Sequence, residues 1–124
     1  SPAHPPSLSP SSTTAYGGGR CAATGLAEPR LLRASHIKPW AKCETDAERL
    51  DVYNGLLLAA HLDAAFDAGL LSFSDTGAIL FSDRFAPSDR ETLGVRPDFA
   101  LTRVAARHLP NLAWHRAHMA GAEF

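Results

Sequence analysis

The sequence predicts an α+β fold in which two short strands lead into a helix, followed by a β-hairpin and C-terminal helices. Short apolar runs bounded by turn residues indicate the strands, and a stretch of helical periodicity separates the first runs from the later ones. A length of 124 residues with 45% hydrophobic content fits a single globular domain. The longest apolar run, Leu56–Ala60, is far too short for a membrane span, so we expect no membrane partner.

The first half of the chain is expected to contain both strands of the opening pair. Cys21–Thr24 is predicted as a short strand ended by a turn, and Leu31–Ile37 as the second strand, which Pro39 stops because proline cannot donate to a ladder. Thr45 with Glu48 resembles a capping box that opens one helical turn.

The second half is expected to be mainly helical, with one hairpin. From Leu57 to Ala68 the apolar residues recur at helical spacing, and the following glycine is a good stop. Leu70–Phe73 and Ala78–Phe81 flank a Ser-Asp-Thr-Gly turn and predict a β-hairpin. The remaining predicted helices are Asp89–Leu93, Leu101–Leu109 and Asn111–Met119, the last two broken at Pro110.

The N-terminal 19 residues differ in composition from the rest of the chain. Residues 1–19 are rich in Ser, Pro, Thr and Gly and have almost no large apolar residues, so burial cannot offset their ordering entropy. We therefore expect a disordered linker over 1–19 and a folded domain over 20–124, with a further N-terminal domain missing from this chain.

The two cysteines form no CxxC pair and do not demand an oxidising compartment, so the expected location is cytoplasmic.

The charges are balanced in total but segregated along the chain. A net charge of −1 by itself argues against nucleic acid, whose binding depends on phosphate neutralisation. Residues 20–42, however, carry five cations against one acid, while the acids gather between Glu44 and Asp98. This distribution permits a basic face beside an acidic metal site, although ordinary solvated charge explains it equally well.

Four polar residues stand where a purely structural account is awkward. His36 ends an apolar strand, Asn54 lies in an Asn-Gly turn, and His61 and Asp63 lie on the following helix. An imidazole is suited to activate water near neutral pH, and a helix-borne carboxylate or imidazole can hold a divalent ion beside a phosphate. The pattern is compatible with phosphodiester hydrolysis.

Three motifs carry a resemblance to a known family. The chain reads ASHIKPW at 34–40, NGLLL at 54–58 and HLDAAFDAGL at 61–70. In this order and spacing the motifs resemble the HNH endonucleases, closest to the prokaryotic restriction-type branch that reads SHI-x-PW, NGLLL and FD-x-G. The resemblance extends from Cys21 to about Met119 and implies a ββα-metal core with the added hairpin and C-terminal helices.

The resemblance implies roles for the matching positions. His36 takes the place of the general base, and Asn54 that of the residue whose side chain steadies the loop and the orientation of the base. Asp63, nine residues after Asn54, falls where the family carries a distal metal ligand, and His61 competes for that role. Residues two apart on a helix point in different directions, so only one of the two is expected to bind the metal directly.

The chain departs from the family pattern directly before the base. Many members place a metal-binding Asp or His there, whereas this chain has Ser35, whose hydroxyl is a poorer ligand for a hard cation. Another acid, Asp51 or Asp67, or else water, is expected to complete the metal shell.

We therefore expect a DNA endonuclease that uses one divalent ion to stabilise the phosphate and the leaving oxygen, producing 5′-phosphate and 3′-hydroxyl ends as the resemblance implies. Mg²⁺ or Mn²⁺ fits an oxygen-rich shell, and Zn²⁺ or Ni²⁺ would fit if His61 is a ligand. Arg33, Lys38 and Arg116 are the candidate contacts to the DNA backbone. Two alternatives remain: an RNA-cleaving or toxin-type nuclease delivered or secreted as an effector, and an inactive HNH fold that only binds DNA.

Overall fold

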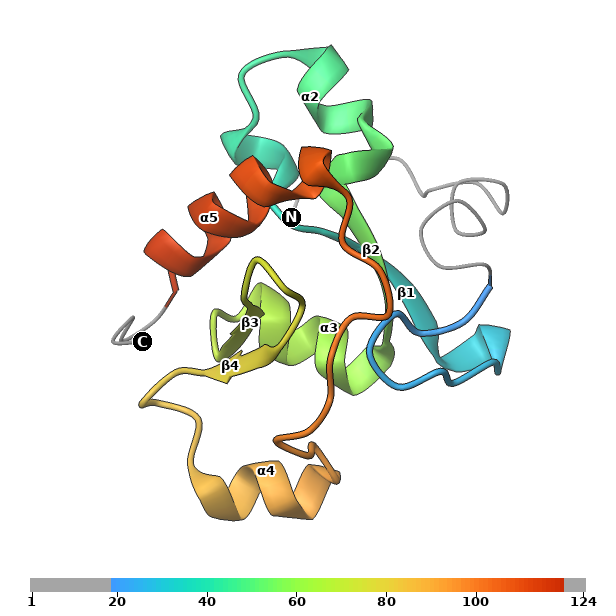
Figure 1. Cartoon of the computed structure of the whole chain (residues 1–124), viewed down its shortest axis with the longest axis vertical. Helices are drawn as coiled ribbons and strands as arrows, with labels where there is room; N and C mark the ends of the chain where they lie inside the picture. Colours follow the sequence, from blue (N-terminus) through green and yellow to red (C-terminus); the bar gives the residue numbers. More distant parts are fainter. Residues whose placement is uncertain (1–18, 120–124) are drawn as a thin grey trace.

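The computed structural model describes residues 19–119 of the chain, so the linker predicted over 1–19 lies, apart from Gly19, outside the described residues. The α+β class is confirmed. Helices α2 (Asp46–Leu50) and α4 (Pro87–Leu93) lie at opposite ends of the molecule, with a β-hairpin and helix α3 (Ala60–Asp67) between them (Figure 1). Four 3₁₀ turns connect the elements: η1 (Pro29–Leu31), η2 (Trp40–Lys42), η3 (Val52–Asn54) and η4 (Ala106–His108). In this described part no helix has the length and apolar character needed to cross a bilayer.

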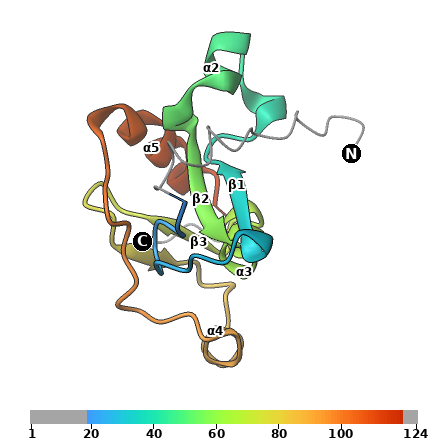
Figure 2. The same ribbon diagram turned by 90° about the vertical axis from the view of Figure 1, so that its right-hand side faces the viewer.

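The central hairpin consists of β1 (Leu32–His36) and β2 (Gly55–Ala59), which pair antiparallel and lie side by side in Figure 2. The register places Ser35 opposite Leu56 and His36 opposite Gly55. Because side chains alternate between the two faces of a strand, Ser35 and Leu56 share one face and His36 lies on the other. The Leu56 face belongs to the hydrophobic core.

Helix α3 packs against both strands of this hairpin. Its core side consists of Leu62, Ala65 and Phe66, which are at most 6% exposed and recur at the spacing of one helix face. The helix stops because Gly69 adopts a positive φ of 74°, which turns the chain so that the following N–H, of Leu70, bonds back to the Ala65 carbonyl.

The strand predicted over Cys21–Thr24 is wrong. These residues form a closed turn in which the Gly25 N–H bonds to the Cys21 carbonyl, and their one bond to the hairpin runs from the Ala22 N–H to the Leu57 carbonyl. The predicted helix starting at Leu57 begins too early, because residues up to Ala59 belong to β2. The base candidate therefore lies on the first strand of the pair and not on the second.

The later elements are partly as predicted. β3 (Leu71–Phe73) and β4 (Ile79–Phe81) form the expected hairpin, but the helix predicted over Leu101–Leu109 is wrong. That segment follows the bridge between Ala78 and Ala100 and contains only η4. Helix α5 (Leu109–Ala117) continues through Pro110, because a proline in the first turn lacks only an N–H that has no partner within the helix.

His115 fastens α5 to the middle of the fold. Its Nε2 lies 2.7 Å from the Phe66 carbonyl oxygen and its Nδ1 lies 2.7 Å from the Ser72 hydroxyl. The carbonyl can only accept, so Nε2 carries the proton and Nδ1 accepts from Ser72. The ring stacks on Phe66 at 3.8 Å between centroids. This buried imidazole therefore joins α5 to α3 and to β3 in its uncharged form.

The stability of the fold is expected to fall in mild acid. Burial lowers the pKa of His115 below its ordinary value of 6.5, although the Phe66 carbonyl and Asp67 act in the opposite direction. Below 6.5 the unfolded chain therefore binds a proton that the folded chain does not, so this contribution to stability is present above 6.5 and is lost as the pH falls. Urea unfolding should show a lower midpoint at pH 5.5 than at pH 7.5.

The variant His115→Gln should be less stable at pH 7.5 and should lose part of this pH dependence. A remainder is expected, because burial also lowers the pKa of His108. If the variant and the parent show the same change in midpoint between the two pH values, His115 is not a source of the effect.

Candidate active site

The His36 imidazole is held by a backbone carbonyl. His36 is the last residue of β1, is half-buried, and places Nε2 3.3 Å from the carbonyl oxygen of Arg49. Because that oxygen can only accept, Nε2 is the protonated nitrogen of the neutral ring. Nδ1 then carries the lone pair, which is the state that a general base requires.

Arg49 in turn is held by three donors of its guanidinium. Nε donates to the Trp40 carbonyl at 3.2 Å, Nη2 to the Cys43 carbonyl at 2.9 Å, and Nη1 to Asp46 at 2.8 Å. The guanidinium carbon also lies 4.9 Å from the centre of the Trp40 ring. Sequence analysis missed Arg49, because its main-chain carbonyl is what touches His36 and no residue pattern reports such a contact.

Asn54 closes the loop that follows the base. Its side chain is 1% exposed; Oδ1 accepts from the Lys38 N–H at 2.7 Å and Nδ2 donates to the Lys38 carbonyl at 3.1 Å. The Asn54 carbonyl also accepts from the Ile37 N–H at 2.9 Å. The residue thus pins the chain one and two positions beyond His36, where a loop-locking residue was expected.

Asp63 faces β1 from helix α3. Its carboxylate lies close enough to the buried hydroxyl of Ser35, the neighbour of His36 on β1, for that hydroxyl to lower its pKa. Burial raises the pKa of Asp63, and so does the charge of Asp67 one helical turn later, while the Ser35 hydroxyl and the nearby Arg33 lower it. Two carboxylates close enough to oppose each other's ionisation form a place where a cation is stabilised.

His61 lies on a different side of α3. It is half-buried and shares its side of the helix with the exposed Ala64 and Ala68, three and seven positions later. Within residues 19–119 its imidazole has no hydrogen bond or ion pair. The structure therefore brings Asp63, and not His61, to Ser35.

The donors around Asp63 suit a hard cation that keeps water. Asp63, Asp67 and the Ser35 hydroxyl offer only oxygen, and Mg²⁺ is commonly bound through one or two carboxylates with the remaining positions filled by water. The described residues contain no group of three or more His, Cys, Asp or Glu side chains placed for a metal ion.

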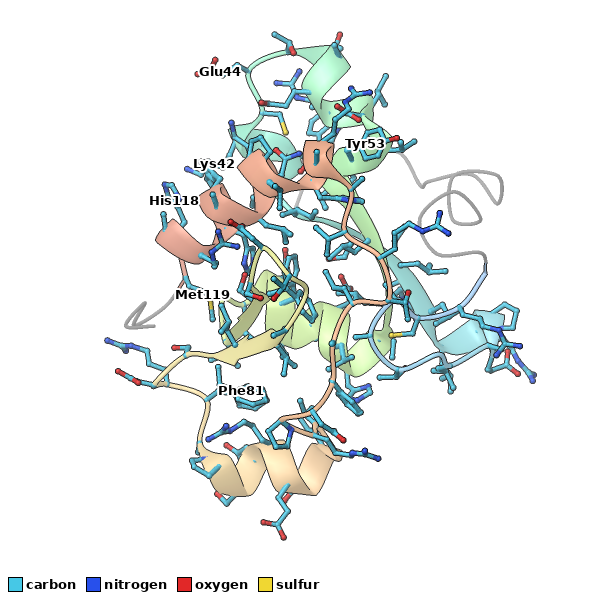
Figure 3. All side chains as sticks on the ribbon, in the orientation of Figure 1. Lys42, Glu44, Tyr53, Phe81, His118 and Met119 are labelled. Carbon is cyan, nitrogen blue, oxygen red and sulfur yellow. The ribbon has the colours of Figure 1, made fainter. Side chains whose placement is uncertain are left out.

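The alternative acid, Asp51, is engaged elsewhere. It accepts from the Tyr53 N–H at 2.9 Å and pairs with Arg107 at 3.1 Å, beside an open groove between α2 and α5. Figure 3 shows Tyr53 beside the start of α5, where Asn111 donates to its carbonyl at 3.1 Å. Asp51 therefore serves the contact between these two segments.

The three cations predicted to contact DNA differ in how exposed they are and in whether they already form an ion pair. Arg33 is exposed on β1. Lys38 is only 15% exposed and pairs with Glu48 at 3.2 Å, and Arg116 pairs with Asp75 at 2.9 Å. The DNA-binding role of these cations stays a prediction, and two of them would have to exchange an internal partner for a phosphate.

Replacing Asn54 by Ala should destabilise the fold strongly. The change leaves the N–H and the carbonyl of Lys38 without the partner that each now has, which we expect to lower the free energy of unfolding by about 2–4 kcal/mol. Urea titration measures it, with Asn111→Ala, which removes one half-buried amide bond, as the matched control. A loss no larger than that of the control would contradict the locking role.

Comparisons with known proteins agree with this arrangement. Residues 21–74 match the sequence model of the HNH endonuclease family. Among solved structures, the chain is similar to one titled "Modification dependent TagI restriction endonuclease", with a TM-score of 0.56 and 21% identity over 90% of this chain. The match spans 37% of that protein's chain, and at this identity it shows a shared fold. No curated protein matches. Because the family match contains the β1–β2 hairpin, α3 and the side chains around His36 and Asp63, the segment 21–74 belongs to the HNH endonuclease family.

Proposed function

We propose that the chain hydrolyses phosphodiester bonds in DNA, with His36 as the general base and one divalent ion bound at Asp63. The supporting observation is that the two groups contact consecutive residues of β1: His36 is held by the Arg49 carbonyl, and the hydroxyl of its neighbour Ser35 lies close enough to Asp63 to lower the pKa of that carboxyl. Consecutive Cα atoms are about 3.8 Å apart, so the imidazole and the carboxylate flank the end of β1 from its two faces. A phosphate that contacts both groups would therefore have to bind beyond that end of the strand.

His36 would take a proton from the attacking water through Nδ1. The Arg49 carbonyl keeps the other nitrogen protonated, so the ring does not have to change its tautomer before it accepts that proton. Once protonated, the imidazolium keeps the same hydrogen bond, because Nε2–H remains a donor.

Asp63 and Asp67 would hold the metal, in preference to His61, and Mg²⁺ or Mn²⁺ suits their oxygens. The bound ion would supply charge stabilisation to the phosphate and to the leaving oxygen. Ser35 would act by orienting Asp63, since its hydroxyl lies close enough to lower the pKa of that carboxyl.

DNA is the substrate that the family and the neighbour's title favour. Arg33 would contact a flanking phosphate, a proposal supported by its exposure and by the effect of its charge on Asp63. Because the neighbour's chain is much longer, we propose that selection among DNA sites or modifications belongs to parts of the protein outside residues 19–119.

The variant His36→Ala should lose cleavage and keep binding. Removing a general base typically costs about 10²–10⁴-fold in rate. Plasmid nicking with Mg²⁺ or Mn²⁺ measures the rate, and a gel-shift titration measures the affinity for DNA. His118→Ala is a matched control, because His118 is the exposed C-cap of α5 and its ring stacks on Trp114 and not on a residue proposed for catalysis.

The same assay separates the alternatives. Cleavage of RNA but not of plasmid would support the toxin-type nuclease, and binding of DNA without cleavage in any divalent metal would support the inactive fold. Undiminished nicking by His36→Ala would overturn the assignment of the base.

The metal ligand is tested by isosteric changes. Asp63→Asn should raise the Mg²⁺ concentration needed for half-maximal nicking by about tenfold or more, since such a change removes one charged oxygen ligand. His61→Gln should leave that concentration within about twofold, because its side chain lies on another side of α3. The reverse result would assign the metal to His61 and favour Zn²⁺ or Ni²⁺.

A further inference from the structure

We infer that Arg49 is a positioning residue for the base: its guanidinium fixes the loop between β1 and β2, and its own carbonyl thereby fixes the tautomer of His36. This inference rests on the proposed function, since it assigns His36 the task of the base. The three motifs at 34–40, 54–58 and 61–70 do not include Arg49, so its role is inferred from its contacts.

The carbonyl of Arg49 lies on a segment that the hydrophobic core does not hold. Helix α2 has five residues, none of which is buried, and the next residue after Arg49, Leu50, is 66% exposed. Helices this short are marginal without tertiary packing. The position of the Arg49 carbonyl oxygen relative to β1 therefore depends on contacts other than burial in the core.

The Arg49 side chain provides two such contacts, beside the ion pair of 3.2 Å between Glu48 of α2 and Lys38. Its Nε and Nη2 reach the carbonyls of Trp40 and Cys43, which belong to the chain that leaves β1. Trp40 and Cys43 follow Lys38, the residue that the Asn54 side chain holds through both its N–H and its carbonyl. The guanidinium therefore joins α2 to the anchored part of the loop, and a charged fork of fixed geometry sets their spacing.

One of the three donors serves a different purpose. The bond from Nη1 goes to Asp46, whose side chain is 89% exposed, and exposed ion pairs contribute little. The two bonds to carbonyls are thus the ones expected to position the helix. This difference supplies a control: Asp46→Asn removes the exposed pair and leaves the fork to Trp40 and Cys43 in place.

The experiment compares Arg49→Met, Arg49→Lys and Asp46→Asn with the parent chain. Methionine keeps the length and the helix propensity but donates no hydrogen bond. The first readout is the tautomer of His36, from long-range ¹H–¹⁵N spectra of the ring nitrogens at about pH 8.5, where imidazoles are neutral. Its signals are assigned by their absence in His36→Ala. The second readout is kcat and KM for plasmid nicking.

The parent and Asp46→Asn should show His36 in the Nε2–H form alone. Arg49→Met should show a mixture of both tautomers, and its kcat should fall by roughly tenfold with KM within about twofold, as expected when a catalytic group is misplaced. Arg49→Lys, with one donor, should lie between the two.

Three outcomes would overturn the inference. In the first, Arg49→Met unfolds at a lower temperature but keeps the single tautomer and the parent kcat, which would make Arg49 purely structural. In the second, Asp46→Asn reproduces the whole effect. In the third, the parent already shows mixed tautomers. Absence of nicking by the parent would instead count against the proposed function, and the tautomer spectra would still decide the role of Arg49.

Discussion

The antiparallel pairing of β1 with β2 is the constraint on which the other features depend. Its register places Ser35 on the face toward α3 and His36 on the face toward Arg49. A slip by one residue would exchange the two faces of the strand and would turn the imidazole into the core. The bonds between Asn54 and the main chain at Lys38 lie directly beside the last pair of this register, so the same residue that closes the loop also opposes the slip.

The sequence predicted an element correctly where its residues fit one kind of secondary structure, and wrongly where they fit both a strand and a helix. The second hairpin was found because its turn residues separate two apolar runs. The residues Gly55–Ala59 are apolar throughout, because both faces of β2 are buried, and they run directly into α3. The end of this strand therefore also fits helical spacing, and the predicted helix began inside it. The segment after Ala100 has helix-forming residues but lies extended, because its bridge to Ala78 and its bond to Ala22 use the backbone groups that a helix needs.

The candidate site was predictable to the extent that side chains define it. His36, Asn54 and Asp63 were predicted from their motifs; in the structure Asn54 bonds to Lys38 beyond the end of β1, and Asp63 lies beside Ser35, the neighbour of His36. The choice between Asp63 and His61 required the orientation of α3 against β1, which sequence spacing leaves open. The carbonyl of Arg49 lay beyond sequence reasoning altogether, because every residue has a carbonyl and only the fold selects one.

The loop between β1 and β2 is held closed next to the two strands, while its outer end is exposed to solvent. Lys38 and Asn54 meet beside the strands, and from Glu44 to Ala47 every residue is exposed. Lengthening a loop whose ends are already fixed costs little, about 0.6 kcal/mol for each doubling. Residues added at this outer end would therefore extend the exposed surface without disturbing the strands, as long as Arg49 keeps its bonds to the Trp40 and Cys43 carbonyls.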